Sequence, residues 1–270
     1  MSTADAYNNH TDPSAAESAK RLLSNSECYR FWKHGYVVLK NFANLSETTE
    51  LKIAARKELA SALDPLEYEA DVGYPWAPTS RFASGGSTIR RLRNAFERHE
   101  SFRKWATSAS LVAAVTRLIG ESISLTLAHH NCIMTKHPHY GSQTRWHRDL
   151  RHWSFSKPSL VIAWLALGDE NEQNGGLRVI PGSHRTIISP SQLDDDKFLA
   201  ESHSQNAELL ASARGVSLET GDLLLFHSLL FHAAGTNLSD EVKLSLAFAY
   251  FGNSNRPSPG SSSESCFKLS

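Results

Sequence analysis

Hydrophobic and polar positions follow one pattern in the first half of the chain and another in the second. In the first half, apolar residues recur every four positions, which places them on one face of a helix that Ser46 is expected to cap. These residues are Leu51, Ala55, Leu59 and Leu63. A second helix is predicted from Ser110 to Leu118, and Gly120 ends it.

Strands are predicted beyond Gly120. Residues 123–127 alternate between apolar and polar side chains, as in a half-buried strand, whereas residues 160–165 are apolar on both faces, as in a central strand. Further strands are expected over 177–180, 223–226 and 242–251, with tight turns at 174–176 and 181–182. Short strands joined mostly by turns are typical of an antiparallel sandwich or barrel. The predicted fold is therefore mainly β with flanking α-helices.

Both ends of the chain differ in composition from the middle. Residues 1–25 and 254–270 are rich in Ser, Pro, Asn and Gly, and they contain too little apolar surface to order themselves. Both are predicted to be disordered, which leaves one domain over residues 26–253.

Charge and cysteine content narrow the function classes. Lys plus Arg is 28 and Asp plus Glu is 28, so no nucleic-acid partner is expected, because such binding needs a net basic face. Three cysteines argue against a disulfide framework, and no apolar run resembles a signal peptide or membrane span. We expect a cytoplasmic protein with a small-molecule substrate, which contacts a membrane peripherally only if that substrate is a lipid. The sequence leaves the oligomeric state open.

The segment 145–149 (RWHRD) contains the first candidate site. Residues two apart on a strand point the same way, so His147 and Asp149 face one side together, opposite Arg148. An imidazole and a carboxylate at this spacing can occupy adjacent positions on a metal, although H-x-D alone is common by chance. Four other histidines crowd one strand end without a carboxylate among them and are not predicted to bind metal: His129, His130, His137 and His139.

Another histidine, His232, follows the buried strand predicted over 223–226. A ligand distant in sequence, on another strand, is what a two-histidine, one-carboxylate triad requires. Such a triad fills one face of an octahedral ferrous ion and leaves the opposite face open. His227, at the end of the same apolar run, is interpreted as a buried core residue.

A cation lies within the last predicted strand. Lys243 and Ser245 share one face, and a buried ammonium group is costly unless it meets an anion. Together they can hold the distal carboxylate of 2-oxoglutarate. The alternative is that Lys243 extends to solvent from the strand end.

Taken together, these motifs resemble the phytanoyl-CoA dioxygenase family of iron(II)- and 2-oxoglutarate-dependent hydroxylases. The similarity covers about residues 30–251 and rests on H-x-D, N-G-G-L and P-G-S-H within residues 147–184. It continues with Gly221-Asp222 and a histidine eleven residues after that glycine. The resemblance implies a double-stranded β-helix, a jelly-roll or cupin-like core.

The resemblance also implies roles for individual residues. It implies that His147, Asp149 and His232 bind iron, that Lys243 anchors 2-oxoglutarate, and that Trp164 packs beside it. Most members have arginine where this chain has Lys243, which keeps the charge but loses the forked geometry. Retention of Asp149 argues against the halogenating branch. The implied cofactors are Fe(II), 2-oxoglutarate and O2, with ascorbate as a stimulant.

The substrate is the least determined part of the prediction. Arg90 and Arg91 belong to a local basic segment that suits an anionic substrate, and the alternative is a solvated basic face. Trp146 and Trp153 flank the iron segment and are candidate pocket residues. The region 68–93 is loosely similar to hydroxylases of the lipopolysaccharide sugar acid Kdo, while an acyl or secondary-metabolite substrate stays open. So do an inactive metabolite-binding sandwich and a cupin-like enzyme using another divalent metal.

Overall fold

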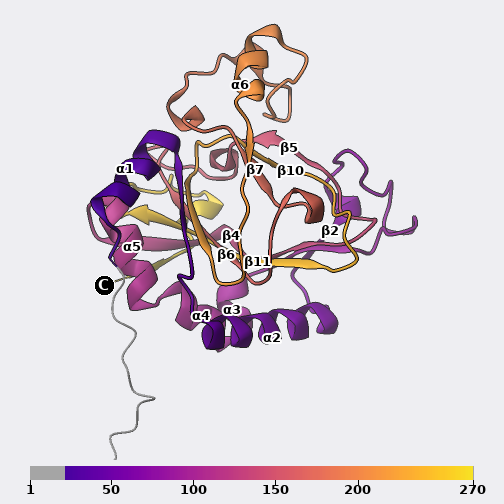
Figure 1. Cartoon of the computed structure of the whole chain (residues 1–270), viewed down its shortest axis with the longest axis horizontal. Helices are drawn as coiled ribbons and strands as arrows, with labels where there is room; N and C mark the ends of the chain where they lie inside the picture. Colours follow the sequence, from indigo (N-terminus) through magenta and orange to yellow (C-terminus); the bar gives the residue numbers. More distant parts are fainter. Residues whose placement is uncertain (1–21, 270) are drawn as a thin grey trace, which may run out of the picture.

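The computed structural model describes residues 22–269 of the chain. The N-terminal extension predicted over residues 1–25 therefore lies almost entirely outside the described residues. Within them, two antiparallel sheets pack face to face, and most of the helices cover the outer face of the larger sheet (Figure 1). The predicted mainly β sandwich with flanking helices is confirmed.

The larger sheet has the strand order β1-β9-β6-β11-β4-β3-β2, with β12 added along β4. Its strands are β1 (Tyr36–Leu39), β2 (Leu66–Tyr68), β3 (Ile89–Arg93), β4 (Ile123–Lys136), β6 (Val161–Ala166), β9 (Leu223–His227), β11 (Lys243–Gly252) and β12 (Cys266–Lys268). As predicted, β6 lies in the middle of this sheet, and all its residues are buried. A strand with both faces covered needs apolar residues at every position, which explains its unbroken apolar run.

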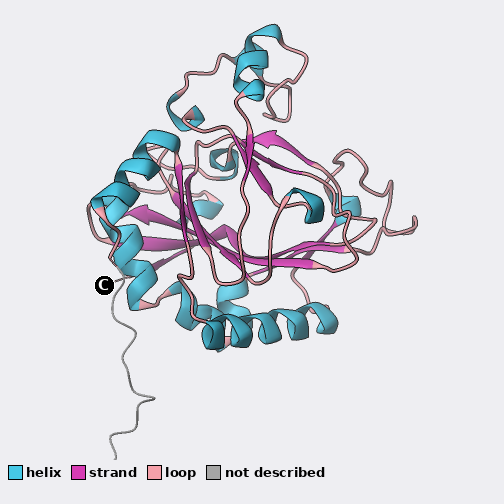
Figure 2. Cartoon of the chain, viewed as in Figure 1, coloured by secondary structure: helices cyan, strands magenta, loops and turns pink. Residues whose placement is uncertain are grey.

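The smaller sheet has the order β5-β10-β7-β8. Its strands are β5 (Thr144–His147), β7 (Leu177–Val179), β8 (Arg214–Gly215) and β10 (His232–Ala234). Between β7 and β8 the chain leaves the sheet and forms a lobe, residues 183–213, which contains the helix α6 (Ala207–Ala211) and rises above the sandwich (Figure 2). Because both ends of the lobe return to one sheet, the lobe extends the sandwich without interrupting it.

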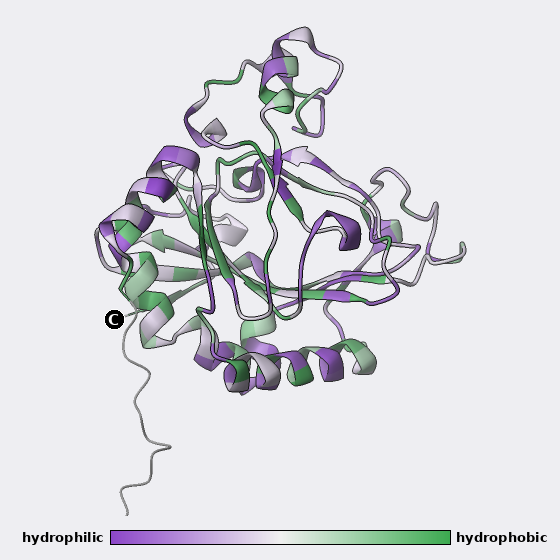
Figure 3. Cartoon of the chain, in the orientation of Figure 1, coloured by the Kyte–Doolittle hydropathy of each residue, from purple (hydrophilic) through white to green (hydrophobic). Residues whose placement is uncertain are grey.

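The space between the sheets is filled from both sides. The larger sheet contributes side chains such as Ile162 and Phe226, and the smaller sheet contributes Leu177 and Val179. In Figure 3 the strands that line this layer are largely hydrophobic, while the lobe and the outer side of α2 carry more polar residues. Burial of apolar surface in this layer is the main force that holds the sheets together.

Most helices lie in the first half of the chain, as predicted, but the strands β1, β2 and β3 of the larger sheet lie between them. These helices are α1 (Asn25–His34), α2 (Leu45–Ser61), α3 (Ala95–Arg98), α4 (Glu100–Ala106) and α5 (Ala109–Ile119). The cap of α2 is Asn44 rather than the predicted Ser46, because the Asn44 side chain accepts the Glu47 amide. The predicted face is buried at Leu51 and Ala55, but Leu63 lies beyond the end of the helix and is exposed.

Two further expectations need correction. The strand predicted over 123–127 continues to Lys136, through an irregularity at which His129 has φ 61° and the pairing with β11 shifts register. The C-terminal segment predicted to be disordered is ordered as far as Leu269, because β12 forms backbone hydrogen bonds with the edge of β4 and the Leu269 side chain is buried. Among residues 22–269, no helix has the length and apolar character needed to cross a bilayer.

Candidate active site

The H-x-D segment and the distant histidine meet on the smaller sheet. His147 ends β5 and His232 begins β10, and these residues are directly paired across the two strands. Asp149 follows β5 in a short 3-10 turn. One ligand atom from each of the three residues lies within 4.8 Å of the others, and all three residues are buried. Strand pairing therefore brings together the ligands predicted from separate parts of the sequence.

Hydrogen bonds hold both imidazoles in one tautomer. His147 Nδ1 lies 2.8 Å from the carbonyl oxygen of Arg145, and His232 Nδ1 lies 3.1 Å from that of Leu230. A carbonyl oxygen only accepts, so Nδ1 carries the proton in each ring and Nε2 presents a lone pair. Burial, followed by the neighbouring His232, lowers the pKa of His147 to about 4, which keeps this ring neutral as metal binding requires.

The carboxylate of Asp149 completes an arrangement that fits a cation. Its Oδ1 lies 3.5 Å from His147 Nε2 and 3.4 Å from His232 Nε2, and it has no hydrogen-bond partner among the described residues. Two nitrogen lone pairs and a carboxylate oxygen repel one another unless a positive charge lies between them. Two imidazoles and one carboxylate on one side of the ion are the donor set of non-haem Fe(II) oxygenases.

His130, on β4, contacts this carboxylate from behind. Its Nε2 lies 2.8 Å from Asp149 Oδ2, the oxygen that does not face the two ligand histidines. Burial would raise the pKa of Asp149, but His130 and His232 hold it well below its usual value. Burial likewise opposes a charge on His130, yet Asp149 raises the pKa of His130 to about 9. His130 thus orients the carboxylate, as outer partners of metal ligands commonly do.

The predicted cosubstrate anchor lies at the other end of the same inner pocket. Lys243, Trp164 and the three metal-ligand residues all line this pocket. The structure places a carboxylate of the chain itself beside the anchor: Glu170 Oε2 lies 3.1 Å from Lys243 Nζ. Glu170 also accepts hydrogen bonds from the Ser245 hydroxyl and the Trp164 indole. The buried Lys243 is therefore neutralised inside the protein rather than extended to solvent.

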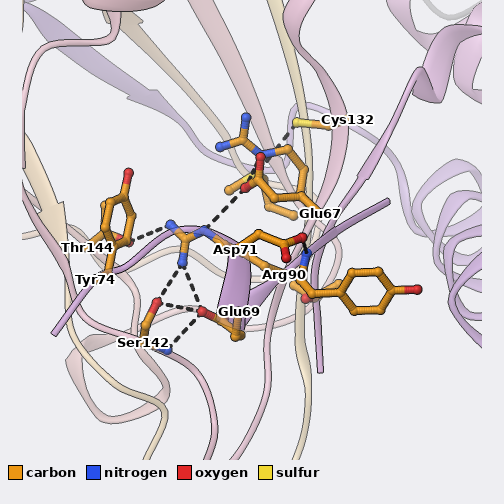
Figure 4. A network of polar contacts seen from close by, with 12 residues as sticks. Glu67, Glu69, Asp71, Tyr74, Arg90, Cys132, Ser142 and Thr144 are labelled. Carbon is orange, nitrogen blue, oxygen red and sulfur yellow. Dashed lines mark hydrogen bonds and ion pairs between the residues drawn. The ribbon is translucent and has the colours of Figure 1, made fainter. Parts of the chain in front are cut away.

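Arg90 and Arg91 have different surroundings although they are adjacent. The Arg90 guanidinium is buried in a network in which it donates to Glu69, Ser142 and Thr144 (Figure 4). Arg91 has only a loose ion pair, with its Nε 3.5 Å from Glu67 Oε1, and this Nε makes no hydrogen bond. The β2–β3 pairing shifts register opposite Arg90, so strand alternation is interrupted and both arginines line the inner pocket.

Arg91 lies between the inner pocket and an outer cavity of about 640 Å3. Tyr74 and His152 also line both spaces. Arg151 lines the outer cavity, where it donates to the Tyr74 hydroxyl and stacks on Phe198 of the lobe. Arg151 also donates to the carbonyl oxygen of Asp196, but it forms no ion pair among the described residues, so its charge at the cavity wall is not matched by a carboxylate.

The two tryptophans predicted to contact substrate line neither space. Trp146 packs with Ile180 and Phe231 in a separate apolar cluster, because it alternates with His147 on β5 and points away from the metal ligands. Trp153 packs beside His130, and its indole donates to the carbonyl oxygen of Ala128. Both are core aromatics in this structure.

Sequence reasoning missed several residues of the site. His130 was grouped with histidines that had no visible acidic partner, and that partner lies on another strand. Glu170 is within a turn-like acidic segment that reads as solvent-exposed, yet it is only 1% exposed. The irregularity at His129 breaks the strand alternation that would otherwise indicate which way His130 points, and no pattern in the sequence identifies the partner of Glu170.

A comparison with protein families supports the resemblance. The family model of phytanoyl-CoA dioxygenase (PhyH) matches residues 31–245. A probable phytanoyl-CoA dioxygenase from Caenorhabditis elegans is 24% identical over 241 residues, which cover 84% of this chain and 75% of that protein. The ectoine dioxygenase of Sphingopyxis alaskensis is 25% identical over 253 residues, which cover 87% and 78%.

Solved structures show the same fold. EctD from S. alaskensis with 2-oxoglutarate and 5-hydroxyectoine matches with a TM-score of 0.72 at 22% identity, covering 87% of this chain and 78% of that chain. The epimerase SnoN from nogalamycin biosynthesis, described as non-haem and α-ketoglutarate-dependent, matches with a TM-score of 0.70 at 22% identity, covering 87% and 86%. The predicted double-stranded β-helix is confirmed.

Proposed function

The chain belongs to the phytanoyl-CoA dioxygenase family and is an iron(II)- and 2-oxoglutarate-dependent dioxygenase, and from this premise we propose that its substrate is a small anion bound in the outer cavity. The observation that carries the proposal is the pair of incompletely matched arginines, Arg91 and Arg151, which line the outer cavity, and Arg91 also lines the inner pocket that holds the metal ligands. Guanidinium groups bind carboxylate and phosphate through paired hydrogen bonds.

The chain's own residues divide the work between the two spaces. His147, Asp149 and His232 would hold the ferrous ion on one side and leave its other side open to the inner pocket. When bound, the metal with 2-oxoglutarate and dioxygen supplies the oxidising power that converts a substrate C–H into an alcohol, with release of succinate and CO2. We assign the cosubstrate to the end of the pocket near Lys243, Ser245 and Trp164.

Substrate orientation is the task we assign to the outer cavity. Arg151 and Arg91 bind the negative group of the substrate, and this contact directs the rest of the molecule into the passage. Tyr74 and Phe198 form apolar walls there, 5.4 Å apart between ring centroids, and they limit the entry of water. Positioning of this kind is the protein's main contribution when a cofactor carries the difficult step.

The family by itself does not identify the substrate. Its members compared above are named for phytanoyl-CoA and for ectoine, which have little chemistry in common. A sugar acid such as Kdo satisfies the arginine pair through its carboxylate, and a cavity of about 640 Å3 has room for one. Coenzyme A thioesters carry phosphates on their coenzyme A part and satisfy the same charge requirement.

A turnover screen tests the proposal. Purified enzyme with Fe(II), 2-oxoglutarate and ascorbate is offered a panel of anionic sugars, acyl thioesters and matched neutral analogues, and succinate release is measured. We expect stimulation by an anion and not by its neutral analogue. Arg151→Gln should raise the KM for that anion at least tenfold, while Arg178→Gln, on the exposed face of β7, should leave it unchanged. Equal stimulation by neutral analogues would refute the anionic substrate.

A further inference from the structure

A second buried lysine faces the cosubstrate end of the inner pocket. Lys136 ends β4, is 5% exposed and lines the same pocket as Lys243 and the metal ligands. In the pairing of β4 with β11, Lys136 lies directly opposite Lys243. Directly opposed residues of antiparallel strands project from the same face, and like charges at such positions repel. This pair of lysines therefore requires negative charge close by.

Among the described residues, a carboxylate is paired directly with only one of the two lysines. Glu170 is bound by Lys243 and Ser245. Lys136 Nζ donates to a neutral acceptor, the carbonyl oxygen of Ser142, at 2.6 Å, and no carboxylate within the described residues forms an ion pair with it. Glu69 is an acidic residue whose charge acts on Lys136, but it forms no ion pair with this lysine. Its Oε2 binds Arg90 and the Ser142 hydroxyl, and its Oε1 makes no hydrogen bond among the described residues.

Two glycines shape the path of the Lys136 side chain. A Cβ atom at Gly175 would lie 2.9 Å from Lys136 Cγ, and one at Gly141 would lie 2.8 Å from Lys136 Cδ. Gly175 belongs to the N-G-G motif and has φ +73°, so any side chain there would also strain the backbone. The lysine is thus held in a narrow channel, with its amine at the wall of the pocket rather than free to reach solvent.

A buried ammonium group without a carboxylate partner destabilises the protein unless a ligand supplies the missing negative charge. Burial, together with Arg90 and Lys243, lowers the pKa of Lys136 to about 7, and these effects outweigh the opposing effect of Glu69. The cosubstrate is a dianion whose distal carboxylate must end in this part of the pocket if its other end reaches the metal. A carboxylate beside Lys136 would balance the charge that Glu170 leaves unbalanced.

We propose that Lys136 is the principal cation binding the distal carboxylate of 2-oxoglutarate, and that Lys243, already matched by Glu170, is its secondary partner. The proposal rests on the cosubstrate placement in the function proposed above. It assigns the charge to β4, whereas the family resemblance assigns it to the position of Lys243 on β11.

Binding of two 2-oxo acids tests this assignment. With Mn(II) in place of iron and without dioxygen, titration calorimetry measures the Kd of 2-oxoglutarate and of 2-oxopentanoate, which has a methyl group instead of the distal carboxylate. In the unaltered protein we expect 2-oxoglutarate to bind at least tenfold more tightly. Lys136→Met should remove most of this preference by weakening 2-oxoglutarate at least tenfold while leaving 2-oxopentanoate within twofold, and Lys136→Arg should restore part of it.

The matched control removes the other lysine together with its carboxylate. The double variant Lys243→Met/Glu170→Leu keeps the local charge balance, and it should weaken 2-oxoglutarate by less than Lys136→Met does. The assignment is overturned if Lys136→Met keeps the preference, if the double variant loses more of it, or if Lys136→Met weakens both acids equally, which would indicate a purely structural role. Failure of the unaltered protein to bind either acid would instead refute the cosubstrate placement itself, and the assignment with it.

Discussion

The two ends of the inner pocket balance their charges in different ways. At the metal end, the groups that face one another are all electron-pair donors, and Asp149 Oδ1 has no internal partner. At the end that we assign to the cosubstrate, Lys243 is already matched by Glu170, whereas Lys136 forms no ion pair among the described residues. A site that binds an external ligand can be recognised by a buried charged or polar group that has no partner within the protein. By that criterion, the carboxylate of Glu170 beside Lys243 says more about the role of this lysine than its positive charge does.

Removal of the carboxylate at the metal end should have the largest effect. Asp149→Ala leaves two imidazoles, which hold a ferrous ion too weakly for turnover. We expect metal affinity to fall at least a hundredfold and succinate release to disappear, as measured by metal titration and by product analysis. His147→Ala should behave in the same way. Retention of stoichiometric metal binding in either variant would show that the ligands lie elsewhere.

At the cosubstrate end, Glu170→Leu should reveal how strongly the internal pair is coupled. The substitution leaves the ammonium of Lys243, whose side chain is 4% exposed, without its carboxylate. Breaking a buried pair by removing one partner costs about 3 kcal/mol of unfolding free energy. Denaturant unfolding should therefore show a clear loss for Glu170→Leu and recovery of most of it in the double variant with Lys243→Met. Equal stability of the single variant and the unaltered chain would mean that this end is not balanced internally.

A smaller effect is expected from His130, which contacts the metal end from behind. His130→Asn is too short to reach Asp149 Oδ2, and loss of such an outer contact typically weakens metal affinity about tenfold. The matched control is His129→Asn, because His129 is adjacent but faces the outer cavity, and asparagine tolerates its positive φ. Metal titration of both variants tests this role of His130. If the two variants bind metal with equal affinity, His130 contributes only to packing.

Much of the fold follows from local pattern, and the exceptions have physical causes. Strand β6 was predictable because a run of apolar residues on both faces has few other uses. The continuation of β4 beyond Leu127 was not, because the irregularity at His129 interrupts the alternation on which such predictions depend. The C-terminal strand β12 contains little apolar surface and depends on an edge of β4 that sequence does not reveal.

The site shows the same division. The metal triad was predictable since H-x-D and a distant histidine define a donor set, and the β5–β10 pairing brings them together. The pairing of Glu170 with Lys243 was not, because two charged residues 73 positions apart carry no mark of their contact. Arg91 was a candidate from its basic segment, whereas Arg151 became one only when the cavity placed it near Tyr74. Residue types and their spacing predict which side chains can bind a metal or an anion. Which charged residues neutralise one another can be known only from the folded structure.

The lobe over residues 183–213 has a consequence for how enzymes of this architecture diversify. Its Phe198 supports Arg145 and Arg151 at the cavity wall, while both of its ends return to the smaller sheet. The length and composition of such a segment can change without altering the spacing of the paired histidines. A changed lobe would give a different cavity wall, and therefore a different set of molecules that can enter. The part of the cavity wall that the lobe contributes can therefore evolve apart from the metal ligands, whereas Arg151 belongs to the segment that carries Asp149.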